Sequence, residues 1–184
     1  MLTTVVILAA IVPLASFTWA LRQHFRSTGG MPTGMRGLTA ASGLVALLFL
    51  ALVIDGGVSG PRAFAFLILS ALSTSLFWWT VKTTRRRPPQ VAYSSAAPDS
   101  LYDEGPYAFV RHPFYLAYCL FWLGTAVAAG SFQWFAGLFI ISWYVVIART
   151  EEASFLGTSM AESYLRYKRR TGMIVPKFSR IPPW

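Results

Sequence analysis

Apolar residues are gathered in five long runs, which short polar or basic stretches separate. The runs cover Leu2–Leu21, Leu38–Ile54, Ala63–Val81, Phe114–Ala129 and Phe132–Ala148. A helix needs roughly 17–25 apolar residues to span a bilayer, so the pattern predicts an all-α integral membrane protein with five transmembrane helices. Only Gly130-Ser131 separates the last two runs, and so short a link predicts a tight antiparallel hairpin.

Composition and loop charge support this interpretation. Hydrophobic residues make up 55% of the chain and charged residues 12%, whereas soluble domains carry about 25% charged residues. Much of the net charge of +9 falls in the first and third loops and the C-terminal tail, while the second and fourth loops are poor in Lys and Arg. Because basic loops face the cytoplasm, we expect the N-terminus outside and the C-terminus in the cytoplasm. Arg85–Arg87 are typical of an anchor to anionic membrane lipids.

The residue composition and the spacing of Cys and His disfavour several functions. Too little sequence lies outside the apolar runs to build a nucleic-acid-binding domain, so we expect no nucleic acid among the partners. The single Cys119 lies inside an apolar run and allows no disulfide within the chain. His24 and His112 are far apart, and no HExxH or CxxC spacing occurs, so we expect no metal site.

Two polar stretches on the expected cytoplasmic side are too long to be simple connections. Residues 85–107 are rich in Pro and Ser and predict an irregular loop, whereas residues 149–170 have helical character. They flank the predicted hairpin, whose two cytoplasmic ends bring them together. We therefore expect a cofactor pocket formed by the 85–113 loop and the C-terminal segment. Within one membrane domain, residues 1–84 would form a three-helix region and residues 85–184 the cofactor-binding region.

These stretches supply aromatic, basic and acidic side chains to the cytoplasmic end of the predicted hairpin. They are Tyr102, Tyr107, Arg111, His112 and Tyr115 from the first side, and Arg149, Glu151, Glu152, Tyr164 and Tyr167 from the second. Pro113 fits the first turn of a helix, and the backbone donors before it are expected to seat a carboxylate. Adjacent carboxylates bind an ammonium group or ribose hydroxyls, and tyrosines stack on a heterocycle or face a cation. S-adenosylmethionine carries all of these groups, whereas a dinucleotide would need a phosphate-binding GxGxxG or Walker loop, which the chain lacks.

Each residue also has a plainer interpretation. Arg111 and Arg149 are typical of positive-inside anchors, Glu151-Glu152 of a solvated helical turn, and His112 of a helix cap. Their occurrence together at the two ends of one hairpin favours a binding site.

The segments GPYAFVRHPFY (105–115), RTEE (149–152) and ESYLRYKRR (162–170) resemble the isoprenylcysteine carboxyl methyltransferase family and its phospholipid N-methyltransferase relatives. The resemblance covers about residues 99–176 and implies an integral membrane enzyme that uses S-adenosylmethionine as cofactor. Ala117 and Met160-Ala161 depart from the family pattern, which puts helix packing and acceptor shape in doubt more than cofactor binding.

Carried over by motif, the resemblance implies a set of cofactor contacts. They are Asp99, Ser100, Leu101, Tyr102, Tyr107, His112, Pro113, Phe114, Tyr115, Glu151 or Glu152, Tyr164 and Tyr167. Arg149, Glu152 and His112 are the catalytic candidates, and Arg149 would meet the methyl acceptor.

The implied reaction is methyl transfer to a lipophilic small molecule or lipidated substrate on the cytoplasmic side. A carboxylate on an isoprenylcysteine-like or isoprenoid compound would pair with Arg149 and needs no general base. An amine or thiol would have to be deprotonated, for which His112, Glu151 or Glu152 are the candidates. Two other interpretations are an NADPH-dependent reductase of the steroid 5α-reductase type, which has a related RHP motif, and a non-catalytic membrane scaffold. The oligomeric state is left open.

Overall fold

The computed structural model describes residues 1–27, 29–94 and 96–177, and all regular structure in them is helical. The helices are α1 (Leu2–Gln23), α2 (Thr33–Gly56), α3 (Gly60–Thr84), the short 3-10 helix η1 (Gly105–Ala108), α4 (Pro113–Ala129), α5 (Ser131–Phe155) and α6 (Ala161–Arg170). No strand occurs among the described residues, which confirms the predicted all-helical class.

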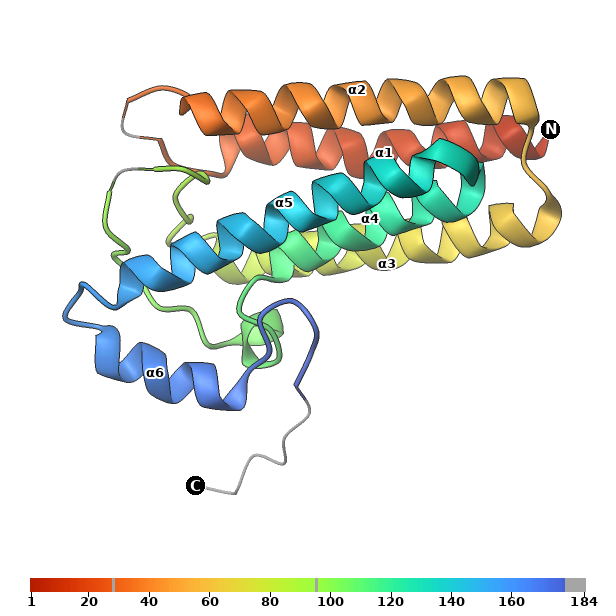
Figure 1. The fold of residues 1–184 in the computed structure, drawn as a ribbon. Coiled ribbons are helices and arrows are strands. Elements are labelled where there is room, and N and C mark those ends of the chain that lie inside the picture. Colours follow the sequence, from red (N-terminus) through yellow and green to blue (C-terminus); the bar gives the residue numbers. More distant parts are fainter. Residues whose placement is uncertain (28, 95, 178–184) are drawn as a thin grey trace.

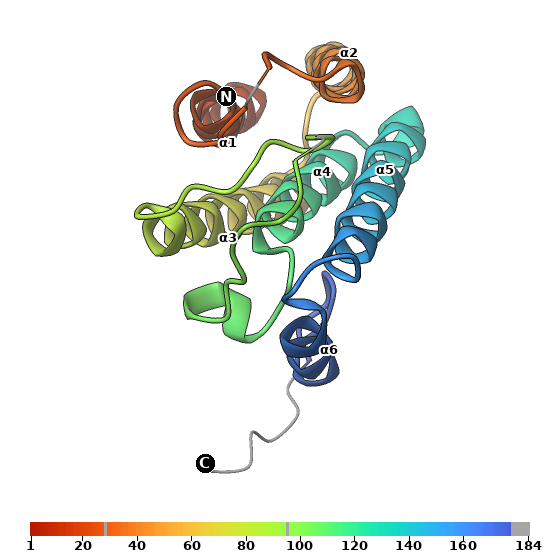
Figure 2. The same ribbon diagram turned by 90° about the vertical axis from the view of Figure 1, so that its left-hand side faces the viewer.

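The five long helices run side by side (Figure 1). Viewed end-on, α1 and α2 lie on one side of α3, α4 and α5, and the segment that follows α3 passes between the two groups (Figure 2). The short helices η1 and α6 lie at the end of the bundle where α1 ends and α2 begins. This arrangement gathers the long loop, the start of α4 and the end of α5 at one end of the molecule.

Aromatic rings and small side chains hold the centre of the bundle together. The Phe17 ring on α1 lies 5.1 Å from the Phe77 ring on α3 and 4.6 Å from the Tyr118 ring on α4, measured between centroids. The Ser73 hydroxyl on α3 donates a 2.7 Å hydrogen bond to the carbonyl oxygen of Ala117. Such small polar residues are typical of contacts between helices in a membrane.

Four helices, α1, α2, α3 and α5, are long and apolar enough to cross a membrane. The fifth predicted span coincides with α4, which has 17 residues and falls just below that length. A helix rises about 1.5 Å per residue, so α4 would cover about 26 Å of a hydrocarbon core that is about 30 Å thick. The multi-pass membrane character is thus supported, while the fifth crossing stays a prediction.

The turn between α4 and α5 confirms the predicted hairpin. Gly130 has a φ of +67° and Ser131 a φ of +45°, so two residues in the left-handed region reverse the chain. At the other end, α4 begins at Pro113 as predicted. α5 continues past Ala148, where the apolar run ends, and carries Glu151 and Glu152 in its last turns. Together with α6 it confirms most of the helical character predicted for residues 149–170.

Candidate functional site

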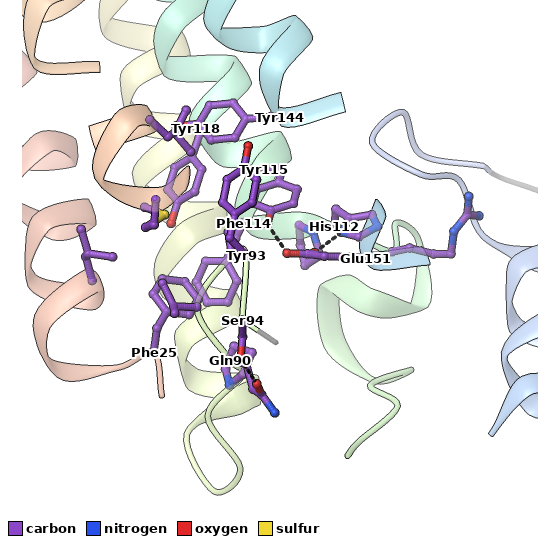
Figure 3. A pocket seen from close by; sticks show the side chains of 18 of the residues that line it. Phe25, Gln90, Tyr93, Ser94, His112, Phe114, Tyr115, Tyr118, Tyr144 and Glu151 are labelled. Carbon is purple, nitrogen blue, oxygen red and sulfur yellow. Dashed lines mark hydrogen bonds and ion pairs between the residues drawn. The ribbon is translucent and has the colours of Figure 1, made fainter. Parts of the chain in front are cut away.

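A cavity of about 430 Å³ lies between α1, α2, α4 and α5, and the loop of residues 89–102 forms part of its wall. This volume is within the range of small-molecule sites. One end is lined by charged and hydroxyl-bearing residues, and the other by apolar residues from the helices. Figure 3 shows part of the lining, with His112, Tyr115 and Glu151 from the polar end and Tyr118 and Tyr144 from the apolar end.

Glu152 is the centre of a cluster of basic groups at the polar end. Arg111 Nε donates to Glu152 Oε1 at 2.6 Å, and the two side chains are only 9% and 7% exposed. Lys168 Nζ lies 2.9 Å from the other carboxylate oxygen. Arg111 also donates to the carbonyl oxygens of Lys168 and Thr171, at the end of α6. Arg111 is therefore not a lipid anchor but the buried group that joins α4, α5 and α6.

Glu151 has a different environment, although it is the next residue. The Tyr115 hydroxyl donates to Glu151 Oε1 at 2.6 Å, and His112 Nδ1 lies 3.5 Å from Oε2. His112 Nε2 lies 3.5 Å from Glu152 Oε1 on its other side. The imidazole is thus held between two carboxylates, and no Arg or Lys pairs with Glu151 in the described part of the chain. Glu151 is the carboxylate with capacity left for a ligand.

The backbone before α4 has partners that the sequence did not reveal. The amides of Arg111 and His112 donate to the carbonyl oxygens of Gly172 and Met173, at 2.8 and 3.1 Å. The expectation that these donors seat a carboxylate is therefore wrong, because the chain after α6 already uses them. The same pairing fixes His112 in front of α4.

Tyrosines surround the polar end. The rings of Tyr102 and Tyr107 lie 5.2 Å apart, and the Tyr167 hydroxyl donates to the carbonyl oxygen of Tyr107 at 2.8 Å. Tyr164 stacks on Phe155 with 4.6 Å between ring centroids. Burial raises the pKa of Tyr107, Tyr164 and Tyr167 above the ordinary value, so these phenols stay protonated at neutral pH and can donate hydrogen bonds.

Asp99 lies at the outer edge of the site. Arg26 donates to its carboxylate at 2.7 Å, and this hydrogen bond lowers the pKa of Asp99 below the ordinary value. The pair joins the segment after α1 to the loop, which holds the loop across the cavity.

An aromatic wall runs from His112 into the membrane region. The His112 and Tyr115 rings stack 5.4 Å apart, Tyr115 and Tyr144 stack 5.4 Å apart, and Tyr118 lies 5.3 Å from Tyr144. Beyond this wall the lining is mainly apolar and comes from the first two helices and from α4. Its members include Leu14, Phe17, Leu21, Met35, Leu38, Ala46 and Trp122.

Sequence reasoning missed all of these deeper residues, although the spacing of two of them is a signal that could have found them. Tyr118 follows Tyr115 by three positions and Tyr144 precedes Glu151 by seven, and both spacings repeat one helix face. No motif marks the lining residues of α1 and α2.

The structure brings most of the predicted site residues to this cavity. Those in the lining are Asp99, Ser100, Leu101, Tyr102, Tyr107, His112, Pro113, Phe114, Tyr115, Glu151, Glu152, Tyr164 and Tyr167. Arg149 is not among them, since its side chain is exposed on the outside of α5. The functional roles of all these residues stay predictions.

Buried polar atoms of the lining suit a ligand with polar groups. Among the described residues, the Trp122 indole nitrogen makes no hydrogen bond. The same is true of the two atoms at the polar end, the Tyr164 hydroxyl and His112 Nε2, which faces Glu152 Oε1 only at 3.5 Å. A buried polar atom without a partner is costly, so a bound molecule that pairs with both would stabilise this end. An amino-acid or ribose moiety has the acceptors and donors for this, and the neighbouring tyrosines suit an aromatic base. The residues therefore fit S-adenosylmethionine.

Comparison with known proteins supports the predicted resemblance. The family model for phospholipid methyltransferases matches residues 64–163, more than half of the 184-residue chain. A stretch of 77 residues is 30% identical to the protein-S-isoprenylcysteine O-methyltransferase of Schizosaccharomyces pombe. That stretch covers 41% of this chain and 33% of the relative, so the chain matches about a third of the relative's length.

Proposed function

Because the chain belongs to the phospholipid methyltransferase family, we propose that it transfers a methyl group from S-adenosylmethionine to a lipophilic acceptor. The observation that carries this proposal is a single cavity with two unlike ends. The polar end has unpartnered groups on His112 and Tyr164, and the apolar end extends between membrane helices. A polar cofactor and an apolar acceptor could share such a cavity.

The polar end would hold the cofactor. Glu151 would bind an ammonium group or ribose hydroxyls through charge-assisted hydrogen bonds, because Glu152 is already engaged by Arg111 and Lys168. Tyr102 and Tyr107 would face the aromatic base. S-adenosylmethionine supplies a reactive methyl group on a sulfonium ion. The contribution of the protein is then to orient the reactants and to exclude water.

The acceptor has two candidate chemistries. A carboxylate of an isoprenylcysteine-like or isoprenoid compound is the candidate favoured by the sequence motifs, with Arg149 as its cationic partner. An amine is favoured by the lining, since His112 and Glu151 can take a proton there and Arg149 lies outside the cavity. A carboxylate would have to lie outside the cavity to meet Arg149, whose side chain is exposed on α5.

The test is methyl transfer from radiolabelled S-adenosylmethionine by the purified protein in nanodiscs. Phosphatidylethanolamine in the nanodisc is the amine acceptor, and an N-acetylated S-farnesylcysteine is the carboxylate acceptor. Titration calorimetry with S-adenosylmethionine, and with NADPH as the comparison ligand, measures cofactor binding separately from turnover.

Two variants test cofactor binding and acceptor binding separately. Glu151→Gln is expected to weaken cofactor binding by roughly tenfold or more, as loss of a charged hydrogen bond of about 1.5–3 kcal/mol would do. Arg149→Ala should reduce turnover of the farnesylcysteine only, with unchanged cofactor binding. Arg86→Ala, an exposed basic residue at the same end, is the control for loss of positive charge. If parent protein and Glu151→Gln bind S-adenosylmethionine equally, the assigned cofactor site is wrong.

A further inference from the structure

Tyr93 has an unusual backbone conformation in the loop that lines the cavity. Its φ of +64° lies in the left-handed region, which residues with a side chain seldom adopt. The neighbouring chain is firmly anchored, because Val91 is buried and its amide donates to the carbonyl oxygen of Arg26 at 2.9 Å. A strained residue next to an anchored one marks a conformation that its surroundings impose.

The surroundings of the Tyr93 ring are a glycine on α2 and a tryptophan on α5. A Cβ placed on Gly34 would lie 2.7–2.8 Å from three carbon atoms of the ring, so the ring fits only because position 34 is glycine. The Tyr93 hydroxyl accepts a 2.6 Å hydrogen bond from the Trp143 indole nitrogen. The Trp143 ring itself lies over Gly37, one turn further along α2. Tyr93 and Trp143 therefore join α2 to α5.

This junction lies at the margin of the cavity, where Tyr93 lines the cavity and is also 42% exposed on the outside of the molecule. Tyr93 lines the cavity, as do Ser42 on α2 and Tyr144 on α5. On the outer faces, Leu44 and Leu47 of α2 and Phe139 of α5 are 57–68% exposed, as expected of lipid-facing side chains. In the end-on view, α2 and α5 are neighbours at one margin of the molecule (Figure 2), and Figure 3 shows Tyr93 among the residues that line the cavity.

We propose that the Tyr93–Trp143 pair is a latch that closes a lateral route between α2 and α5, by which a lipophilic acceptor passes from the bilayer to the cavity. The nature of the passing molecule rests on the proposed function, whereas the latch itself does not. Release of one hydrogen bond allows the Tyr93 ring to leave Gly34, and the left-handed backbone at Tyr93 favours that movement.

The experiment measures access to the cavity without cofactor or acceptor. A single reactive thiol is placed in the lining by Ser42→Cys in a Cys119→Ser background, with Ala46→Cys as a second reporter one turn deeper. The protein in nanodiscs is alkylated either by N-hexadecylmaleimide dissolved in the bilayer or by a charged, water-soluble maleimide. Mass spectrometry gives the rate of modification by each reagent.

The latch is then weakened in three ways. Tyr93→Ala removes the ring, Tyr93→Phe removes only the hydrogen bond, and Gly34→Ala displaces the ring while keeping its chemistry. Gly37→Ala is the matched control, because its added methyl would lie 3.8 Å from Trp143, an ordinary contact. Both glycines lie in the first two turns of α2, and alanine has the higher helix propensity of the two residue types.

If the pair is a latch, the three variants should be alkylated faster than the parent protein by N-hexadecylmaleimide, whereas the rate with the water-soluble maleimide should change little. Loss of one hydrogen bond in Tyr93→Phe should raise the first rate about 2- to 10-fold, and Tyr93→Ala and Gly34→Ala should raise it more. The proposal is overturned if Gly34→Ala behaves as Gly37→Ala, or if both reagents accelerate equally, which general loosening of the fold would cause. Because no methyl donor is present, this outcome is independent of whether the protein is a methyltransferase.

Discussion

Replacement of Arg111 by methionine is expected to destabilise the protein strongly while leaving the membrane helices in place. Arg111 is 9% exposed and binds Glu152 at 2.6 Å. It also donates to two carbonyl oxygens at the end of α6. Methionine keeps most of the apolar volume of the side chain and removes the charge and all of these hydrogen bonds.

The expected loss in the free energy of unfolding follows from the Glu152 carboxylate, which stays buried when Arg111 is removed. Removing one partner of a buried ion pair costs about 3–5 kcal/mol, because the other charge stays buried. Lys168 still lies 2.9 Å from Glu152, so the lower end of the range, about 3 kcal/mol, is expected. For a chain of this size, 1 kcal/mol corresponds to roughly 2–4 °C in Tm, which gives a decrease of roughly 6–12 °C.

Thermal unfolding of the detergent-solubilised protein, followed by circular dichroism, measures the change. Glu162→Gln is the control, because it breaks the exposed Arg166–Glu162 pair on α6, and such pairs contribute at most about 1 kcal/mol. The Arg111→Met/Glu152→Gln double variant should be more stable than Arg111→Met alone, since the buried carboxylate is then neutral and the Lys168 ammonium, whose side chain is 47% exposed, can stay hydrated. The buried pair does not hold the site together if the Tm decreases of Arg111→Met and Glu152→Gln are additive in the double variant. The same conclusion follows if Arg111→Met has the same Tm as the parent protein.

Two further predictions concern the segments that position the site. His24 Nε2 lies 2.9 Å from the Thr84 hydroxyl, and burial lowers the pKa of His24 below 6.5. Because the folded protein then binds fewer protons than the unfolded chain, Tm should fall as pH decreases through about 6.5. His24→Gln should make Tm less dependent on pH between pH 7.5 and 5.5. Gly105→Ala should lower Tm, because Gly105 has a φ of +58° and an added Cβ would lie 2.5 Å from the Thr83 hydroxyl oxygen; Gly60→Ala, whose Cβ meets nothing within 4 Å, should leave Tm nearly unchanged.

Hydropathy predicted the helices well because a long apolar run can be recognised from composition alone. The five apolar runs correspond to α1–α5, and Gly130-Ser131 forms the predicted turn. The helix ends are less visible in hydropathy, since α5 continues to Phe155 although its apolar run ends at Ala148. Its last two turns carry polar residues, so hydropathy places the end of the span and not the end of the helix.

The candidate site was predictable where one motif contributes several residues. The stretch 111–115 and the acidic pair 151–152 both reach the cavity. The contribution of α1 and α2 was not predictable, because Leu14 and Leu38 look like any other apolar residue of a membrane helix. Tyr93 was equally hidden, since its role depends on Gly34 and Trp143, which are distant in sequence.

Helix geometry explains why Glu151 and Glu152 have different partners. Successive residues of an α-helix point about 100° apart, so the two carboxylates point in different directions from α5, with the His112 ring between them. Glu152 points toward Arg111 and Lys168, and Glu151 toward Tyr115 and His112. Both residues line the cavity, but the Glu152 carboxylate is engaged by Arg111 and Lys168, whereas no Arg or Lys in the described part of the chain pairs with Glu151. The two substitutions should accordingly separate, with Glu152→Gln acting mainly on stability and Glu151→Gln mainly on ligand binding.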